Sequence, residues 1–325
     1  MAIEDQVPTE SGFPMKPAAA AVVSQVELAG KTAIVTGGYS GIGLETVRAL
    51  AAKGVSVVVP VRRPAKAAET LAAMPGDVTT APLDLADLGS VRQFARDMQS
   101  RLPRLDLLIN NAGIMACPET RVGPGWEAQF GVNHMGHYAL TTALMPLLEK
   151  TGGARVVALS SSGHKIADIQ WDDLHWQSAP YDKWRAYGQA KTANALFANA
   201  LSRRLQGSGG LAFSVHPGGI FTPLQRHLPK EEMVALGWLN ADGEPSELAK
   251  QGFKTPDQGA TTTLWAATSP LLAGKPGVYC ENCDIAAPTD PTSPYARYMG
   301  VNAHACSDAS AERLWSLSAA LLDAA

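Results

Sequence analysis

The stretch TAIVTGGYSGIGLETVRAL, residues 32–50, decides the fold. A short apolar run typical of a strand leads into a turn with glycines at 37, 41 and 43, and a helical pattern follows. Glycine lets the backbone approach a ligand closely, and a diphosphate can bind the free amides and positive dipole end of a helix N-terminus. The spacing G-x-x-x-G-x-G is wider than the common G-x-G-x-x-G fingerprint, and such turns alone are a weak signal. The position between the first strand and a helix nevertheless indicates a dinucleotide site.

Beyond this stretch, strand patterns alternate with helical ones. Most of the strand candidates are continuously apolar, as expected for strands that are covered on both faces. They are TAIVTG from Thr32, SVVVPV from Ser56, TTAPLDL from Thr79, LDLLIN from Leu105, RVVALS from Arg155, LAFSVHP from Leu211 and GVYC from Gly277. Helical patterns between them include residues 42–52, 90–100 and 126–148. The alternation predicts an α/β, Rossmann-type three-layer sandwich with a single, mostly parallel sheet of about seven strands.

Composition and charge narrow the class of protein. The chain has 325 residues, of which 46% are hydrophobic and 18% charged, as in a folded globular protein. Its formal net charge of −3 gives no reason to expect nucleic acid or an anionic membrane as a partner. Neither a membrane span nor a signal peptide is recognisable, and four cysteines do not make a disulfide framework. We therefore expect a reduced, cytoplasmic protein.

The first 27 residues differ from the rest. They are polar and broken by Pro8, Pro14 and Pro17, without a period that would bury one face. We interpret residues 1–27 as a tail that is either disordered or packed across its own subunit or a neighbour. Residues 28–325 show no internal repeat and no linker, so they are predicted to form a single domain.

The end of the second strand bears on cofactor choice. An NAD-preferring site places an acidic residue there, on the ribose diol. This chain instead has Val61 followed by Arg62 and Arg63. Arginine can bind a 2′-phosphate through two parallel hydrogen bonds, which favours NADP over NAD. The alternative is a solvated arginine pair at the start of a loop.

A tyrosine and a lysine stand four residues apart in RAYGQAKTANALFANAL, residues 185–201. Helical spacing places Tyr187 and Lys191 on the same face. An ammonium beside a phenol lowers the pKa of the phenol, so that Tyr187 could move a proton near neutral pH. The plain alternative is an ordinary surface pair.

Six motifs in one order resemble the short-chain dehydrogenase/reductase family over residues 31–279. They are TGGYSGIG, LDLAD, INNAG, VNHMGHY with ALSSSGH, YGQAK and HPGGIFTP. The NHxGHF-like stretch and the long gap between serine and tyrosine resemble the retinol-dehydrogenase-like branch. With the arginines, the implied cofactor-binding residues are Gly37, Tyr39, Ser40, Gly41, Ile42, Gly43, Arg62, Arg63, Asp84, Leu85, Asn111, Ala112, Gly113, Tyr187, Lys191, Pro217, Gly218, Ile220 and Thr222.

The resemblance implies hydride transfer between a nicotinamide and a carbonyl or alcohol carbon. Tyr187 would be the acid/base, Lys191 would bind the nicotinamide ribose, and Asn133 would hold a water that links Lys191 to solvent. Ser161, chosen from three adjacent serines by the subgroup's V-S-S pattern, would hydrogen-bond the carbonyl oxygen. The expected activity is that of an NADP-dependent carbonyl reductase or alcohol dehydrogenase. The alternatives are reduction of an activated C=C bond and a non-catalytic NADP(H) sensor.

Substrate recognition is less clear. Trp171, Trp176, Tyr181 and Trp184 could form an apolar wall or pack their own loop. The family's substrate lid would span about 220–256, where Leu224, Leu228, Met233, Leu236 and Trp238 suit an apolar ligand, core packing or a subunit contact. The family resemblance also suggests a homodimer or homotetramer formed through helix pairs beside the sheet.

Several other features are discounted. Cys280 and Cys283, with His304 and Cys306, could supply four zinc ligands, but the H-x-C spacing is unusual and the chemistry needs no metal. No metal is therefore predicted. His134 and His137 are interpreted as helix-packing residues. A C-terminal amphipathic helix from Ala309 is expected to cover a sheet edge or a partner subunit.

Overall fold

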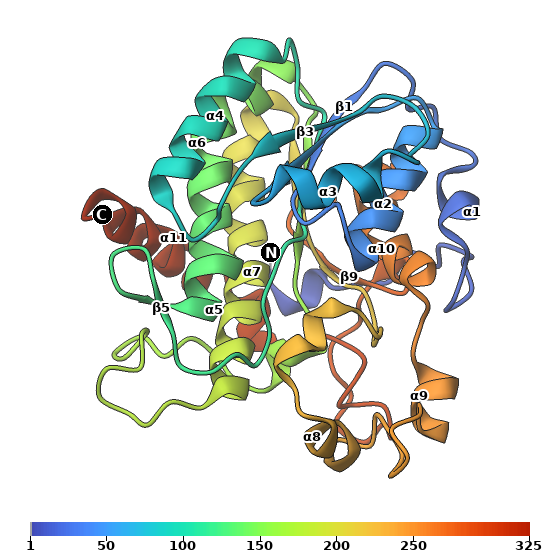
Figure 1. Ribbon diagram of the computed structural model, residues 1–325, viewed down its shortest axis with the longest axis vertical. Helices are drawn as coiled ribbons and strands as arrows, with labels where there is room; N and C mark the ends of the chain where they lie inside the picture. The colour runs from blue at the N-terminus through green and yellow to red at the C-terminus, as the bar shows by residue number, and fades with distance from the viewer. Residues whose placement is uncertain (1) are drawn as a thin grey trace.

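A mostly parallel sheet of eight strands forms the centre of the molecule, with helices on both faces (Figure 1). The computed structural model describes residues 2–325, apart from the side chain of Lys66. In the order in which they lie side by side, the strands are β10 (Asp284–Ile285), β9 (Tyr279–Glu281), β8 (Leu211–His216), β7 (Arg155–Leu159), β4 (Leu107–Asn110), β1 (Thr32–Val35), β2 (Ser56–Val61) and β3 (Val78–Pro82). The predicted three-layer fold is confirmed.

The sheet has one strand more than the seven expected. β10 is a two-residue edge strand that pairs antiparallel with β9, whereas every other neighbouring pair in this eight-stranded sheet is parallel. The connecting turn places Asn282 and Cys283 at φ of 49° and 58°. Because neither residue is glycine, the sequence gives no strong sign of this turn.

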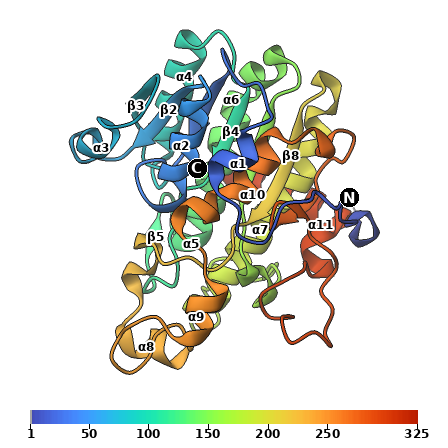
Figure 2. The same ribbon diagram turned by 90° about the vertical axis from the view of Figure 1, so that its right-hand side faces the viewer.

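Long helices cover the two faces of the sheet (Figures 1 and 2). One face carries α4 (Leu88–Arg101), α6 (Gly136–Thr151) and α7 (Lys183–Leu205), and the other carries α2 (Gly41–Ala52) and α10 (Pro256–Thr268). Neighbouring residues of β1 point to opposite sides, so Ile34 packs in the first apolar cluster and Val35 in the second. Shorter or more peripheral helices include η1 (Ile3–Asp5), α1 (Ala19–Val23), α3 (Pro64–Leu71), η3 (Ser162–Lys165), η4 (Gln206–Ser208), η6 (Pro270–Leu272), η7 (Ala303–Cys306) and α11 (Asp308–Asp323).

The segment predicted as one helix over 126–148 is divided. A small hairpin of β5 (Arg121–Val122) and β6 (Trp126–Glu127) comes first, followed by α5 (Ala128–Phe130) and the π-helical turn η2 (Gly131–Met135). The buried Glu127 carboxylate accepts hydrogen bonds from the backbone N–H groups of Gln129 and Phe130, which begins the helix there. Single π turns are frequent at functional sites, and this one contains Asn133.

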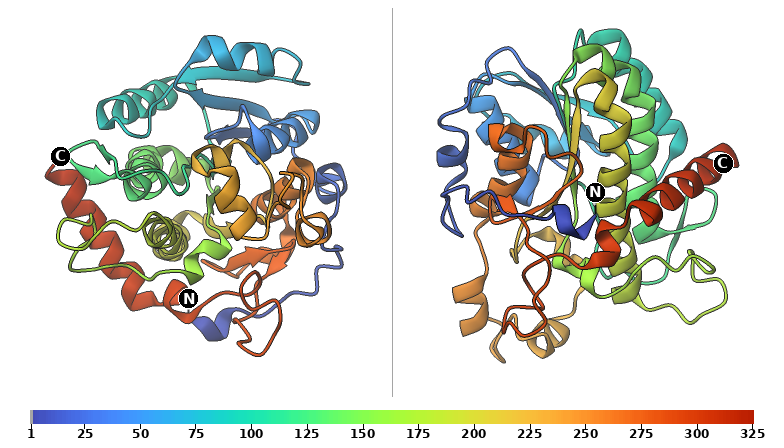
Figure 3. Two further views of the ribbon diagram at one scale, coloured as in Figure 1. Left: turned by 60° about the horizontal axis from the view of Figure 1, so that its bottom comes forward. Right: turned by 180° about the vertical axis from the view of Figure 1, so that it is seen from behind.

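The chain ends pack on the chain itself (Figure 3). In the N-terminal segment, the Asp284 carboxylate accepts hydrogen bonds from the backbone N–H and hydroxyl of Thr9, each at 2.7 Å. Further along, α1 packs against α2 and α10. Thr9 and α1 of the predicted tail thus contact the rest of the same chain.

The C-terminal helix α11 lies on α7 rather than on a sheet edge. Its Trp315 ring stacks on Phe197 at 5.9 Å, and its Glu312 carboxylate accepts hydrogen bonds from Arg203 and Arg204. No helix in residues 2–325 is both long and apolar enough to cross a bilayer.

The sheet topology positions a cleft. From β1 the chain moves outward to β2 and β3, and then returns to β4 on the other side of β1. The loops after β1 and β4 therefore leave the sheet side by side and in opposite directions, which opens a crevice at their carboxyl ends.

Candidate active site

A cleft of about 820 Å³ lies at the carboxyl ends of β1, β4 and β7. Nearly every residue that the sequence places in the site lines it. These are Gly37, Tyr39, Ser40, Gly41, Ile42, Gly43, Arg62, Asp84, Leu85, Asn111, Ala112, Gly113, Ser161, Tyr187, Lys191, Pro217, Gly218, Ile220 and Thr222. The two predicted site residues that do not line the cleft are Arg63 and Asn133.

The glycine loop forms a cradle that side chains would fill. A Cβ atom on Gly43 would lie 2.4 Å from the Gly37 carbonyl oxygen, and Gly37 and Gly41 have φ of 66° and 53°. The first turn of α2 receives no side-chain hydrogen bond from Ser40, whereas Asp87 and Asp182 cap α4 and α7. The helix N-terminus that faces the cleft thus keeps free N–H groups, which fits the diphosphate of a dinucleotide.

The two arginines after β2 differ in their position relative to the cleft. Arg62 is exposed and lines the cleft, whereas Arg63 is the N-cap residue of α3 and does not. Asp84 is the only carboxylate among the described residues that line the cleft. Of the two arginines, only Arg62 therefore lines the cleft.

Tyr187, Lys191 and Ser161 meet at the inner end of the cleft. Tyr187 and Lys191 are buried on successive turns of α7, and Ser161 follows the end of β7. The Ser161 side chain interacts with the phenol and accepts a hydrogen bond from the Gly163 backbone N–H at 3.0 Å. The ammonium nitrogen of Lys191 lies 5.5 Å from the centroid of the Tyr187 ring.

The prediction that Lys191 lowers the pKa of Tyr187 is wrong for this arrangement. Burial raises the pKa of Tyr187 to about 12, and the hydrogen bond with Ser161 offsets this only in part. Burial also lowers the pKa of Lys191 to about 8. The Lys191 ammonium donates to the Leu159 carbonyl oxygen at 3.0 Å rather than to the phenol, so desolvation dominates.

The three adjacent serines differ in their contacts. β7 ends at Leu159, so all three serines lie beyond the strand. The Ser160 hydroxyl donates to the Lys191 backbone carbonyl at 2.8 Å, and the Ser162 backbone N–H donates to Nδ1 of His216. Of these three serines, Ser161 is the one whose side chain acts on the pKa of Tyr187, and its choice as the catalytic serine stays a prediction.

Asn133 lies behind the cleft instead of lining it. Its side-chain oxygen accepts from the Ile114 backbone N–H at 2.9 Å, and its side-chain nitrogen donates to the Ile114 carbonyl at 2.9 Å. Asn133 therefore secures the loop after β4. Its suggested role in holding a water stays a prediction.

The apolar wall of the cleft comes from the lid. The chain leaves the sheet region at Ile220 and returns at Lys254, which pairs with it in a parallel bridge. Between them lie η5 (Pro223–His227), α8 (Lys230–Ala235) and α9 (Glu247–Gly252), which project away from the layers in Figure 2. Apolar lid residues on the cleft are Leu224, Trp238 and Phe253.

The loop before α7 contributes packing rather than a wall. Trp176 packs edge-on against Tyr181, and Trp171 lies under Arg313, all away from the cleft. Trp184 lies behind Tyr187 in an apolar cluster that also contains the predicted lid residues Leu228 and Met233. Its indole N–H donates to the Glu232 carboxylate at 2.8 Å, which ties α8 to α7.

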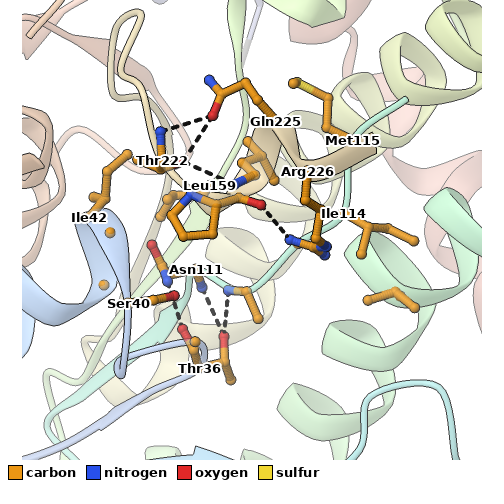
Figure 4. Close-up of a pocket in the computed structure, with 18 of the residues that line it drawn as sticks. Thr36, Ser40, Ile42, Asn111, Ile114, Met115, Leu159, Thr222, Gln225 and Arg226 are labelled. Carbon is orange, nitrogen blue, oxygen red and sulfur yellow. Dashed lines mark hydrogen bonds between the residues drawn. The ribbon is translucent and has the colours of Figure 1, made fainter. Parts of the chain in front are cut away.

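Sequence reasoning missed several cleft residues (Figure 4). The hydroxyl oxygen of Thr36 accepts from the backbone N–H groups of Asn111 and Ala112, each at 2.9 Å. Across the cleft from Thr36, Gln225 bonds the Thr222 backbone and Arg226 bonds the Pro223 carbonyl. Thr36 opens the TGGYSGIG motif and could have been found, whereas no pattern in the sequence marks Arg226.

The two cysteines of the Cys-x-x-Cys pair lie in the protein interior as free thiols. Cys280 and Cys283 are buried, and burial raises the pKa of both thiols. Within residues 2–325, no group of three or more His, Cys, Asp or Glu side chains is placed to hold a metal ion.

Comparisons with known proteins agree on one family. A family model described as short chain dehydrogenase matches residues 31–233. A protein of Streptomyces lividans described as a probable oxidoreductase is 42% identical over 304 residues, which covers 92% of this chain and all of that protein. Retinol dehydrogenase 11 of Mus musculus is 38% identical, over 92% of this chain and 88% of the relative.

Two solved structures are similar to this chain over most of its length. An uncharacterised protein from Mycobacterium paratuberculosis superimposes with a TM-score of 0.70 at 34% identity, covering 93% of this chain and 97% of the other. The Pseudomonas aeruginosa RhlG/NADP active-site complex gives a TM-score of 0.59 at 26% identity, covering 79% of this chain and 96% of the other.

Proposed function

This chain belongs to the short-chain dehydrogenase family, in its retinol-dehydrogenase-like branch, and is an oxidoreductase; from that premise we propose that it uses NADP to interconvert a bulky, apolar aldehyde or ketone and the corresponding alcohol. The observation that carries the proposal is the grouping of Ser161 with the buried Tyr187 and Lys191 at the inner end of a cleft with a glycine cradle. The proposal is also supported by the lid, because its apolar side chains line the same cleft.

Each polar residue has a distinct role in this proposal. A nicotinamide cofactor bound in the cleft would supply or accept the hydride. Tyr187 would donate its phenol proton to the carbonyl oxygen as negative charge develops there, and Ser161 would hydrogen-bond the same oxygen. Lys191 would bind the ribose hydroxyls from the turn of α7 that follows Tyr187.

The protonation state of Tyr187 at neutral pH suits carbonyl reduction rather than alcohol oxidation. A phenol with a pKa of about 12 keeps its proton at neutral pH, and a proton donor is what carbonyl reduction needs. The substrate would lie against Met115 and the apolar lid residues Leu224 and Trp238, which line the cleft near Tyr187. We therefore expect reduction of a large carbonyl compound to be the easier reaction to detect at neutral pH.

Oxidation of NADPH, followed by absorbance, tests the proposal against terpenoid, aromatic and small aliphatic carbonyl compounds. Turnover that rises with the size of the apolar group supports it. Turnover of activated alkenes but not of carbonyls would replace it with C=C reduction. Tight NADPH binding without turnover of either class would point to an NADP(H) sensor.

Replacement of Arg62 with alanine tests the choice of cofactor. A charge-assisted hydrogen bond to phosphate contributes about 1.5–3 kcal/mol, so we expect Arg62→Ala to raise the Kd for NADPH roughly 10- to 100-fold. The Kd for NADH should stay nearly unchanged, since NADH has no 2′-phosphate. Fluorescence titration of both cofactors measures the two values.

Arg63→Ala is the matched control, because Arg63 carries the same charge one residue away but does not line the cleft. It should leave both Kd values within about twofold. Equal weakening of NADPH and NADH by Arg62→Ala, or wild-type preference for NADH, would contradict NADP specificity.

A further inference from the structure

One buried imidazole joins three of the segments that form the cleft. His137 lies in the first turn of α6 and is only 2% exposed. Its Nε2 is 2.8 Å from the hydroxyl oxygen of Thr36, and its Nδ1 is 3.0 Å from the backbone carbonyl oxygen of Asn133. The proposed reaction assigns no role to this side chain.

The hydrogen positions follow from the partners. The Asn133 carbonyl can only accept, so Nδ1 of His137 carries the hydrogen and Nε2 is the acceptor. The Thr36 oxygen already accepts from the backbone N–H groups of Asn111 and Ala112, so its own hydrogen is the one to donate. Of its two possible acceptors, Nε2 of His137 at 2.8 Å is nearer than the Ile109 carbonyl oxygen at 3.3 Å. Burial lowers the pKa of His137 to about 4, and the neutral form that this pattern requires is therefore the one present at neutral pH.

These bonds close a ring around the floor of the cleft. Thr36 begins the glycine loop, and it holds the loop after β4 through Asn111 and Ala112. The same loop is held again at Ile114 by the side chain of Asn133. His137 completes the ring because it bonds Thr36 on one side and Asn133 on the other.

We infer that His137 is a positioning residue, which sets the cofactor cleft by fixing the glycine loop, the loop after β4 and the π-helical turn relative to one another. The inference rests on the proposed function, in that the cleft is taken to bind NADP(H). It replaces the interpretation of His137 as a simple packing residue.

A neighbouring histidine shows what simple packing looks like. His134 is 1% exposed and lies among Phe130, Tyr138 and Phe197. Its Nε2 is 2.8 Å from the Ser318 hydroxyl, and its buried Nδ1 has no hydrogen-bond partner. None of these contacts touches the cleft, so His134→Phe is a matched control for His137→Phe.

The test measures the Kd for NADPH by fluorescence titration, together with the melting temperature. We expect His137→Phe to raise this Kd about tenfold, because both bonds that hold the loops are lost. His134→Phe should change it by less than about twofold. An unchanged Kd in His137→Phe, or an equal change in both variants, would overturn the inference.

Substitutions of Thr36 provide a second, independent test of the inference. Thr36→Val removes the hydroxyl and should weaken NADPH binding, whereas Thr36→Ser keeps the hydroxyl and should restore it. If the two residues act through one bond, the double variant Thr36→Val with His137→Phe should bind no more weakly than the poorer single variant, within about twofold. Losses that multiply in the double variant would contradict the inference.

Two further outcomes can be distinguished from a failure of the inference itself. If His137→Phe does not fold, His137→Asn keeps a donor toward the Asn133 carbonyl and takes its place in the double variant. If the wild type binds NADPH but reduces no carbonyl, the proposed reaction fails while the Kd comparison still decides the role of His137.

Discussion

Tyr187→Phe is expected to lower kcat for carbonyl reduction by about 10² to 10⁴-fold, the usual contribution of a positioned general acid. The substitution removes one hydroxyl, whose partner Ser161 keeps its hydrogen bond to the Gly163 backbone. We therefore expect the Kd for NADPH and the melting temperature to change little. Steady-state kinetics with NADPH and the best carbonyl substrate measure the effect.

Tyr138→Phe makes the same chemical change at a comparable position. The Tyr138 hydroxyl makes one long hydrogen bond of 3.4 Å to the Trp315 carbonyl, under α11 and away from the cleft. This variant should keep wild-type kcat. A Tyr187→Phe enzyme that retains more than about a tenth of wild-type kcat would rule out the phenol as the proton donor.

Lys191→Met is expected to abolish useful turnover and, at the same time, to stabilise the fold at neutral pH. Loss of the ammonium removes the proposed contact with the ribose hydroxyls, so the Kd for NADPH should rise by about 10-fold or more. The Leu159 carbonyl that Lys191 bonds does not lose its last partner, because the side chain of Asn194 also donates to it at 2.8 Å. The substitution therefore removes a buried charge without leaving a buried acceptor unpaired.

The stability effect depends on pH in a defined direction. Burial lowers the pKa of Lys191 from 10.5 to about 8, so the folded state disfavours the ammonium relative to the unfolded state. Below pH 8 both states of the wild type are protonated and the whole cost is present, about 3 kcal/mol at about 1.4 kcal/mol per pKa unit. Between pH 8 and 10.5 the folded state loses its proton first, and this cost disappears.

Chemical denaturation at a series of pH values measures this dependence. The advantage of Lys191→Met should be largest at pH 7 and near zero above pH 10.5. Lys150→Met removes an exposed lysine from α6 and should show no such trend. A Lys191→Met protein that is less stable than the wild type at pH 7 would show that the ammonium is not a net cost to folding.

Local sequence patterns were sufficient to predict the structure wherever consecutive residues determine it. The strand, glycine turn and helix of residues 32–50 are contiguous, and the structure places Gly37, Gly41 and Gly43 on the cleft as predicted. The pair of Tyr187 and Lys191 needs only helical spacing to lie on one face. These elements and the three-layer architecture could therefore be predicted without coordinates.

Features that depend on contacts between residues far apart in the sequence could not be predicted from the sequence alone. The cap of α5 by Glu127 and the π turn after it divide a run of sequence that looks like one helix. The wall of the cleft depends on how the lid folds back at Lys254, so tryptophan density in another loop was a poor guide. The pKa of Tyr187 depends on burial among residues of several elements, which a pair of residues in sequence does not show.

The N-terminal segment has a consequence for the order in which the molecule assembles. Thr9 and its partner Asp284 are 275 residues apart, so a segment that is synthesised early docks on one that is synthesised much later. At about 5–20 residues per second, synthesis of the intervening chain takes roughly 15–55 s. Throughout that interval the segment has no β10 edge to bind, and its docking is a late event that follows synthesis of nearly the whole sheet. During that time Thr9 lacks the Asp284 carboxylate that accepts its hydrogen bonds in the finished fold.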